Sequence, residues 1–300
     1  TNAEERSRQT RDTINEIVER YRDRIFVVPG VDVKQWFDWV PENLAKTGIK
    51  PAVQISKADK LLYQIHQVKN DKDIFFFANL DVANSKIFTA QFNTGSKTPW
   101  RWDPITGKRT VLPHNGSSID IKLVPTESLL IVFEPDLTEK PTMPPVVYAN
   151  DYTQIDTPWD LRLKHVSGCT IKRKLPSLID FKTDPELVKF SGKAFYKTEF
   201  EVSNTKQTLL SLGTVYGISD VKLNGKPLGN RWWGEHTYDV EGILKPGKNV
   251  LEVKVITTLS NFFRVWDNPV AKVWTQEKGN SRDPVSEGLI GPVRLIRQEK

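Results

Sequence analysis

Residues 210–256 read LSLGTVYGISDVKLNGKPLGNRWWGEHTYDVEGILKPGKNVLEVKVI, and they decide the fold of this chain. Short runs of alternating apolar and polar residues are separated by turn residues. Asn224-Gly225 is the dipeptide best suited to a two-residue type I′ hairpin, because both central residues need a positive φ. After the turn at Pro246-Gly247, residues 249–256 alternate between aliphatic and charged side chains. The stretch therefore predicts an antiparallel sheet with one buried and one wet face.

The predicted sheet extends upstream of this stretch. Residues 159–164 and 193–202 alternate in the same way, and residues 175–185 between them predict an ordered loop. Residues 137–155 are rich in proline and polar residues, which is typical of a linker. We therefore expect one β domain over residues 156–300, preceded by a linker over residues 137–155.

Residues 56–136 predict a second all-β unit. The expected strands are 61–68, 74–79, 86–92, 110–112, 119–124 and 129–133, with a turn at residues 70–73. Several short strands at regular spacing favour a β-sandwich of immunoglobulin-like size. The predicted fold class is mainly β, with two sandwiches.

Residues 1–55 have a different pattern. Residues 1–24 carry an amphipathic helical stripe. Residues 24–28, of which the last four are apolar, predict a short buried strand, and Asp32 is a candidate N-cap for a second helix. Its expected stripe is Val33, Trp36, Phe37 and Val40. One strand cannot form a sheet. We therefore expect this segment to be the end of an α/β domain that lies upstream, and the chain to be the C-terminal part of a longer protein.

Composition narrows the classes of function. The net charge is +6, but Lys and Arg are interleaved with Asp and Glu, which argues against a nucleic-acid stripe. No apolar run is long enough to span a bilayer, so we expect no membrane partner. Cys169 is the single cysteine, which excludes an intrachain disulfide and a zinc site built on cysteines.

A search for catalytic motifs finds none. The four histidines have no ligand spacing, and residues 242–248 resemble a phosphate-binding loop but precede a predicted strand instead of a helix. A glycosidase needs two carboxyl groups about 5–9.5 Å apart across a sugar ring. The candidate acids are Asp220, Glu235, Asp239, Asp267 and Glu287, and each is expected on a strand end or loop. We predict no catalytic residue in this chain.

Aromatic residues make a more informative group, since indole rings stack on the C–H faces of sugars. The run 230–236 carries two tryptophans between predicted strands, and the run 261–268, with Trp274 beyond it, fills the next long connection. The alternative for each tryptophan is that it packs in a core or a domain interface. We expect this packing role for Trp100, Trp102 and Trp159. The candidate carbohydrate-binding residues are Trp232, Trp233, Glu235, His236, Arg264, Trp266 and Asp267, with Trp233 and Trp266 as the preferred stacking pair.

These motifs carry a family resemblance. Residues 212–233 with 239–255, together with FSGKAFYKTEFEV (190–202) and EGLIGPVRLI (287–296), resemble the galactose-binding-like jelly-roll module of glycoside hydrolase families 2 and 106. YQIHQVKNDKDIFFFANL (63–80) and PWRWDPITGK (99–108) are similar to a hairpin and a turn of family 106, the α-L-rhamnosidases. Gln67 stands where that family usually has arginine.

The resemblance implies a function without catalysis by this chain. In these families the acid and base lie in an upstream barrel, so we expect a C-terminal accessory region that braces this domain and contacts carbohydrate during polysaccharide degradation. The alternative is a free-standing carbohydrate-binding or interaction module. The resemblance also implies a secreted or periplasmic protein, whose signal peptide would lie upstream. It allows a structural calcium ion, but no D-x-D-x-D-G run marks a site.

Overall fold

The computed structural model describes residues 2–28, 30–135, 146–276 and 283–299. Within them the protein is mainly β, as predicted. The strands of the N-terminal half are β1 (Val53–Ile55), β2 (Leu62–Lys69), β3 (Lys72–Asn79), β4 (Lys86–Phe92), β5 (Thr98–Trp102), β6 (Arg109–Val111), β7 (Ser118–Leu123) and β8 (Ser128–Glu134).

The C-terminal half contains the remaining strands and two short helices. Its strands are β9 (Val146–Gln154), β10 (Trp159–His165), β11 (Thr170–Leu175), β12 (Gly192–Val202), β13 (Gln207–Ser211), β14 (Thr214–Tyr216), β15 (Ile218–Leu223), β16 (Lys226–Arg231), β17 (Thr237–Asp239), β18 (Gly247–Ile256), β19 (Gly288–Gly291) and β20 (Arg294–Glu299). Helices α3 (Ser260–Phe263) and α4 (Pro269–Gln276) follow β18.

The first sandwich packs two sheets over an aromatic core. One sheet has the order β1-β4-β7 and the other the order β2-β3-β8-β5-β6. Phe75 and Phe77 are fully buried, and Phe92 meets the rings of Phe75 and Phe133 at centroid distances of 4.8 Å. The β2–β3 hairpin turns at Asn70 and Asp71, which both have positive φ, in agreement with the predicted turn.

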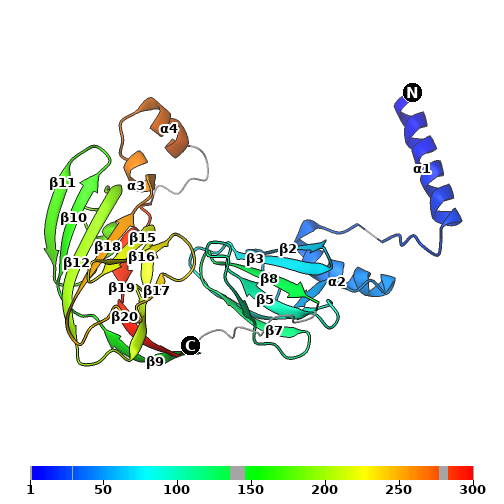
Figure 1. The fold of residues 1–300 in the computed structure, drawn as a ribbon. Coiled ribbons are helices and arrows are strands. Elements are labelled where there is room, and N and C mark those ends of the chain that lie inside the picture. The colour runs from blue at the N-terminus through cyan, green and yellow to red at the C-terminus, as the bar shows by residue number, and fades with distance from the viewer. Residues whose placement is uncertain (1, 29, 136–145, 277–282, 300) are drawn as a thin grey trace.

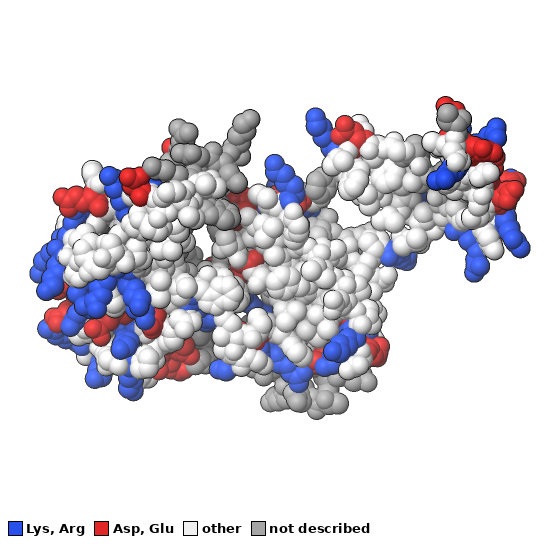
Figure 2. Space-filling view, turned by 90° about the horizontal axis from the view of Figure 1, so that it is seen from above, with Lys and Arg blue, Asp and Glu red and all other residues white. Residues whose placement is uncertain are grey.

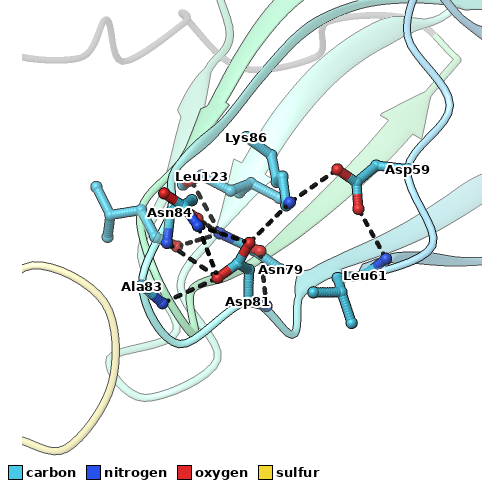
Figure 3. A network of polar contacts seen from close by, with 9 residues as sticks. Asp59, Leu61, Asn79, Asp81, Ala83, Asn84, Lys86 and Leu123 are labelled. Carbon is cyan, nitrogen blue, oxygen red and sulfur yellow. Dashed lines mark hydrogen bonds and ion pairs between the residues drawn. The ribbon is translucent and has the colours of Figure 1, made fainter.

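A polar network closes one end of this sandwich (Figure 3). Lys86 Nζ donates to Asp59 Oδ2 at 2.8 Å and to Asp81 Oδ2 at 3.0 Å. The buried Asn79 side chain donates to the carbonyl oxygens of Asn84 and Val124, both at 2.9 Å. These bonds tie the loop after β3 to β4 and to the end of β7, and so fix the turns at this end.

The second sandwich has a larger core between a six-stranded sheet, β11-β10-β12-β18-β15-β16, and a four-stranded sheet, β17-β13-β20-β9. Trp159 and Tyr196 are fully buried and meet edge to face. The Asn224-Gly225 hairpin is confirmed, with φ of 52° and 77° joining β15 to β16. The alternation predicted for residues 249–256 is confirmed as well, since residues 251, 253 and 255 are buried in β18.

Two predictions about elements were wrong. Residues 25–28 form no strand, because no described strand lies alongside to pair with them, and Phe26 and Val27 are exposed. Where it is described, the predicted α/β segment contains the helices α1 (Asn2–Arg20) and α2 (Trp36–Thr47), and its last residues form β1, which pairs with β4 of the first sandwich. Residues 146–154 of the predicted linker form β9, which pairs antiparallel with β20. The rest of the predicted linker, up to residue 145, lies outside the described residues.

The second helical segment begins as the sequence predicted. The side chain of Asp32 accepts a hydrogen bond from the backbone N–H of Lys34 at 2.8 Å, and a 3-10 turn (Val33–Gln35) leads into α2. The predicted apolar stripe does not face a core, since Val33, Trp36 and Val40 are exposed, and the side chain of Phe37 lies outside the described part. Helix α1 has no buried residue. Figure 1 shows α1 standing apart from both sandwiches, at the far side from the second one.

Candidate functional site

The first group of candidate residues lies on the loop between β16 and β17. Trp232 is 61% exposed, whereas the neighbouring Trp233 is half-buried. Their rings meet edge to face with centroids 6.1 Å apart. Glu235 is exposed on the same loop. The structure therefore brings the two indole rings together, places Glu235 on the same loop, and leaves the indole of Trp232 accessible.

His236, the fourth candidate on this loop, faces the core instead. It is only 7% exposed, and its Nδ1 lies 2.5 Å from Ser219 Oγ, which in turn lies 2.6 Å from the hydroxyl of Tyr238. Burial, together with the charge of Arg231, lowers the pKa of His236 to about 4. His236 thus supports β15 and β17 through a buried hydrogen-bond chain and is not placed to meet a ligand in this structure.

The same loop reaches the first sandwich (Figure 1). A Cβ at Gly234, whose φ is +67°, would lie 3.4 Å from the Cγ of Glu127, in the turn before β8. Burial raises the pKa of Glu127, and the nearby carboxylate of Glu235 adds to the shift. The backbone carbonyl of Glu127 accepts from the N–H of Asn79, so the loop touches the turns that the polar network of Figure 3 fixes. Part of the candidate loop is a junction between the two sandwiches.

The second group of candidate residues follows α3. Trp266 is 41% exposed and stacks on Phe262, with centroids 5.5 Å apart and planes 20° apart. Arg264 is half-buried, and within the described part of the chain its Nη1 has no hydrogen-bond partner. Asp267 is exposed. Trp274 lies in α4, but its side chain lies outside what the structure describes.

The two groups occupy different connections, one after β16 and one after β18. Each makes its ring contacts within its own loop, as the Trp232–Trp233 and Phe262–Trp266 pairs show. The preferred stacking pair of the sequence analysis, Trp233 with Trp266, therefore combines a half-buried ring at the junction with an exposed ring near α3. The binding role of all seven candidates stays a prediction.

The five candidate acids are spread over the second sandwich. Asp220 lies on β15 and pairs with Lys254 at 2.5 Å. Glu235, Asp239 and Asp267 are exposed on separate elements. Glu287 is the exception, because it is 1% exposed just before β19. Their separate positions fit the expectation that these residues cap turns and cover solvated faces.

Glu287 has one property of a catalytic acid. Burial raises its pKa to about 7, and the charge of Asp180 also raises it. The hydrogen bond that its Oε1 accepts from Thr258 Oγ1 at 2.5 Å acts in the opposite direction. Its Oε2 has no partner among the described atoms. A perturbed pKa beside a second acid is typical of active sites, but a side chain this enclosed offers a substrate no approach. Glu287 is better explained as a buried support for the segment that leads into α3.

The described residues offer little for a metal or a phosphate. No group of three or more His, Cys, Asp or Glu among them could hold a metal ion. Residues 242–246 lead directly into β18, which begins at Gly247, so a strand follows this loop, as the sequence predicted, and no helix N-terminus does. No helix in the described part of the chain is long and apolar enough to cross a membrane.

One surface escaped the sequence analysis. A groove of about 700 Å³ crosses the outer face of the six-stranded sheet, with Arg162, Lys172 and Phe195 among its lining residues. The sequence contains a pattern that indicates this basic face, because Lys or Arg recurs at intervals of two or four positions in residues 160–164, 170–174 and 193–197. The strand 170–175, however, was not predicted. Without its register, charges on three strands cannot be assigned to one face.

Comparison with known proteins gives the class of fold. A rhamnosidase from Novosphingobium sp. PP1Y aligns with 87% of this chain at a TM-score of 0.59 and 22% identity, and the aligned part makes up 26% of that structure. At this identity the match establishes a shared fold, one that occurs in a glycoside hydrolase. The resemblance to family 106 itself stays a prediction.

A sequence comparison gives a second relative. The chain is 42% identical over 77 residues to a putative β-glucuronidase of Formosa agariphila, which corresponds to 24% of this chain and 7% of that protein. The chain thus spans about a quarter of the rhamnosidase structure and a small part of the glucuronidase. No family model matches the sequence.

Proposed function

We propose that this chain is a non-catalytic accessory region of a secreted or periplasmic glycoside hydrolase of the α-L-rhamnosidase type that acts on polysaccharide. The observation that carries the proposal is the shared fold, which extends over 87% of this chain but only 26% of the rhamnosidase. The local identity of 42% to a β-glucuronidase points to the same class of enzyme. In this proposal the predicted units 56–136 and 156–300 are two domains, which β1 and β9 extend at their N-terminal ends, and the second is a jelly roll.

Exposed apolar residues support a bracing role for the N-terminal segment. Ile14 and Ile17 of α1, and Tyr21 directly after it, are all exposed. Trp36, at the start of α2, is 53% exposed. Contiguous exposed apolar side chains mark interaction surfaces in soluble proteins. We infer that residues 2–47 pack against the catalytic domain of the same polypeptide.

Exposed indoles support a contact with carbohydrate. Trp232 and Trp266 present accessible rings, and Glu235, Arg264 and Asp267 lie on the same two loops. An indole face matches the C–H face of a sugar, and the charged groups match its hydroxyls. Trp233 contributes by holding the ring of Trp232 edge to face.

The test is affinity electrophoresis of the whole chain in gels that contain plant or bacterial polysaccharides rich in rhamnose. We expect Trp266→Ala and Trp233→Ala each to weaken retention by roughly fivefold, or about 1 kcal/mol, the usual contribution of an aromatic contact. Trp36→Ala is the control, since it removes an exposed indole from α2, outside both loops, and is expected to leave retention unchanged.

If all three variants are retained like the parent, Trp233 and Trp266 have a packing role and do not bind carbohydrate. Retention by the chain on its own, combined with failure to associate with any catalytic domain, would favour the free-standing carbohydrate-binding module instead.

A further inference from the structure

The outer face of the six-stranded sheet is a continuous, ordered surface. The groove of about 700 Å³ is lined by residues from β10, β11, β12, β15 and β18, and seven of them are Lys or Arg while three are Asp or Glu. Five adjacent strands spaced about 4.8 Å apart give a width of roughly 19 Å. Figure 2 shows Lys and Arg side chains, with carboxylates among them, gathered at the end of the molecule that this sheet forms.

Along one line across the groove the charges alternate in sign. The register places Lys174, Asp160, Lys197, Glu252 and Lys222 directly beside one another on β11, β10, β12, β18 and β15. Opposite charges in direct cross-strand positions stabilise a sheet. This row is therefore explained by the stability of the fold, and it needs no ligand.

In the next row of cross-strand neighbours, the charges do not alternate at the β11–β10 end. Here the order is Lys172, Arg162, Phe195, Lys254 and Asp220. Lys254 pairs with Asp220 at 2.5 Å, so the β18–β15 end is compensated. At the other end Lys172 lies directly opposite Arg162, and like charges in this position destabilise a sheet.

A second pair of like charges lies beside the first. Lys164 on β10 is the direct partner of Lys193 on β12. We call Arg162, Lys164, Lys172 and Lys193 the basic quartet. All four are exposed, and no carboxylate in the described part of the chain lies within ion-pair distance of any of them. The guanidinium of Arg162 lies 4.4 Å and the ammonium of Lys164 5.9 Å from the ring centre of Phe195.

We propose that the basic quartet, with Phe195 at its centre, binds an anionic polysaccharide chain that carries carboxylate or sulfate groups. Two like-charge pairs in one sheet cost stability, and a bound polyanion would offset this cost. The planar guanidinium of Arg162 can hold a carboxylate or sulfate through two parallel hydrogen bonds, and the lysines supply point charges beside it. The wide, open face accommodates a chain better than a single small molecule.

The choice of polysaccharide over another polyanion rests on the proposed function. One structural feature supports it. Nucleic-acid binding to a sheet relies on aromatic rings whose faces are free to stack on bases. Phe195 is half-buried, and Arg162 and Lys164 lie near its ring, so it offers a base little free surface.

The test measures binding of the whole chain to polygalacturonate, dextran sulfate and uncharged dextran by isothermal titration calorimetry. We expect binding to at least one of the two polyanions and none to dextran, and the polyanion that binds identifies carboxylate or sulfate as the recognised group. In the double variant R162Q/K172Q the affinity is expected to fall by about tenfold, or roughly 1.4 kcal/mol. Because the variant removes a repulsive pair, its melting temperature should equal or exceed that of the parent.

The matched control is K57Q/K60Q, which removes the same charge from exposed positions next to the first sandwich and is expected to bind like the parent. Equal losses in the two variants, no binding to either polyanion, or tighter binding to duplex DNA would overturn the inference. Retention on neutral rhamnose polysaccharide without binding to either polyanion would overturn the inference, while the proposed function would stand.

Discussion

The two sandwiches hold their buried titratable groups in different ways. In the first, carboxylates pair with cations: Asp73 accepts from Lys97 and His66, both at 2.8 Å, and Glu134 accepts from Lys72 and Arg109. In the second, His236 and Glu287 face the neutral hydroxyls of Ser219 and Thr258.

The difference in partners decides how each sandwich responds to pH. Burial opposes ionisation of Asp73, but its hydrogen bonds from Lys97 and His66 hold its pKa below the usual value. With only neutral hydrogen-bond partners, burial prevails at His236 and Glu287 and shifts each pKa toward the neutral form. Asp73 is thus expected to give the first sandwich stability that is lost in acid. In the second sandwich, His236 is expected to cost stability as the pH falls below 6.5, and Glu287 as the pH rises above 4.5.

The largest expected effects test whether the sandwiches unfold separately. Trp159→Ala and Phe75→Ala each empty a fully buried site in a different core, and such changes cost about 3–5 kcal/mol. We expect Trp159→Ala to lower only the unfolding transition of the second sandwich, and Phe75→Ala only that of the first. Differential scanning calorimetry measures both transitions. Equal shifts of a single shared transition in both variants would contradict two independent cores.

A smaller effect concerns Glu287. Its folded-state pKa is raised from 4.5 to about 7, so the folded state disfavours the carboxylate by up to roughly 3 kcal/mol once the pH exceeds 7. Below pH 4.5 this penalty is absent. We expect Glu287→Gln to gain stability relative to the parent as the pH rises from 5 to 8, measured by urea unfolding.

The control for this prediction is Glu201→Gln, which neutralises an exposed carboxylate on β12. Its difference from the parent should not grow over the same pH range. A constant difference between Glu287→Gln and the parent would show that Glu287 is ionised in the folded protein at all these pH values.

The smallest expected effect concerns the polar network of the first sandwich. The backbone N–H of Ala83, with Lys86 and Asn84, holds the pKa of Asp81 well below its usual range. A depressed pKa adds stability above the unfolded value of 3.8, and this stability is lost as the pH falls through the folded value. Lys86→Met should therefore destabilise the first transition at pH 7 and progressively less below pH 3.8.

Lys60→Met is the matched control, because it removes an exposed lysine from the loop next to Asp59. It should leave the first transition unchanged at both pH values. A deficit of Lys86→Met that stays constant in acid would indicate that its packing, and not its ion pairs, stabilises the turn.

Local sequence signals predicted much of the fold. The hairpin at Asn224-Gly225 requires positive φ, which few other dipeptides adopt, and the alternation in residues 249–256 assigns each side chain to a face. Strand β9 was missed because its stability comes from pairing with β20, far along the chain, and not from its own composition. The error at residues 25–28 has the same origin, since apolar residues form a strand only where a partner exists.

The candidate site was less predictable for a related reason. The sequence placed Trp232, Trp233 and His236 on one loop, but neighbouring residues of a loop can point to opposite sides. Only the structure shows that His236 turns inward to Ser219 while Trp232 remains exposed. The basic quartet needs the register of three strands, which local patterns do not give.

The most direct test of the central claim, that this chain serves a glycosidase without supplying its catalytic carboxylates, is an assay of the purified chain on 4-nitrophenyl α-L-rhamnoside. The account predicts no release of nitrophenol above the buffer rate. Turnover that disappears when Asp220, Glu235, Asp239, Asp267 or Glu287 is replaced by its amide would contradict it.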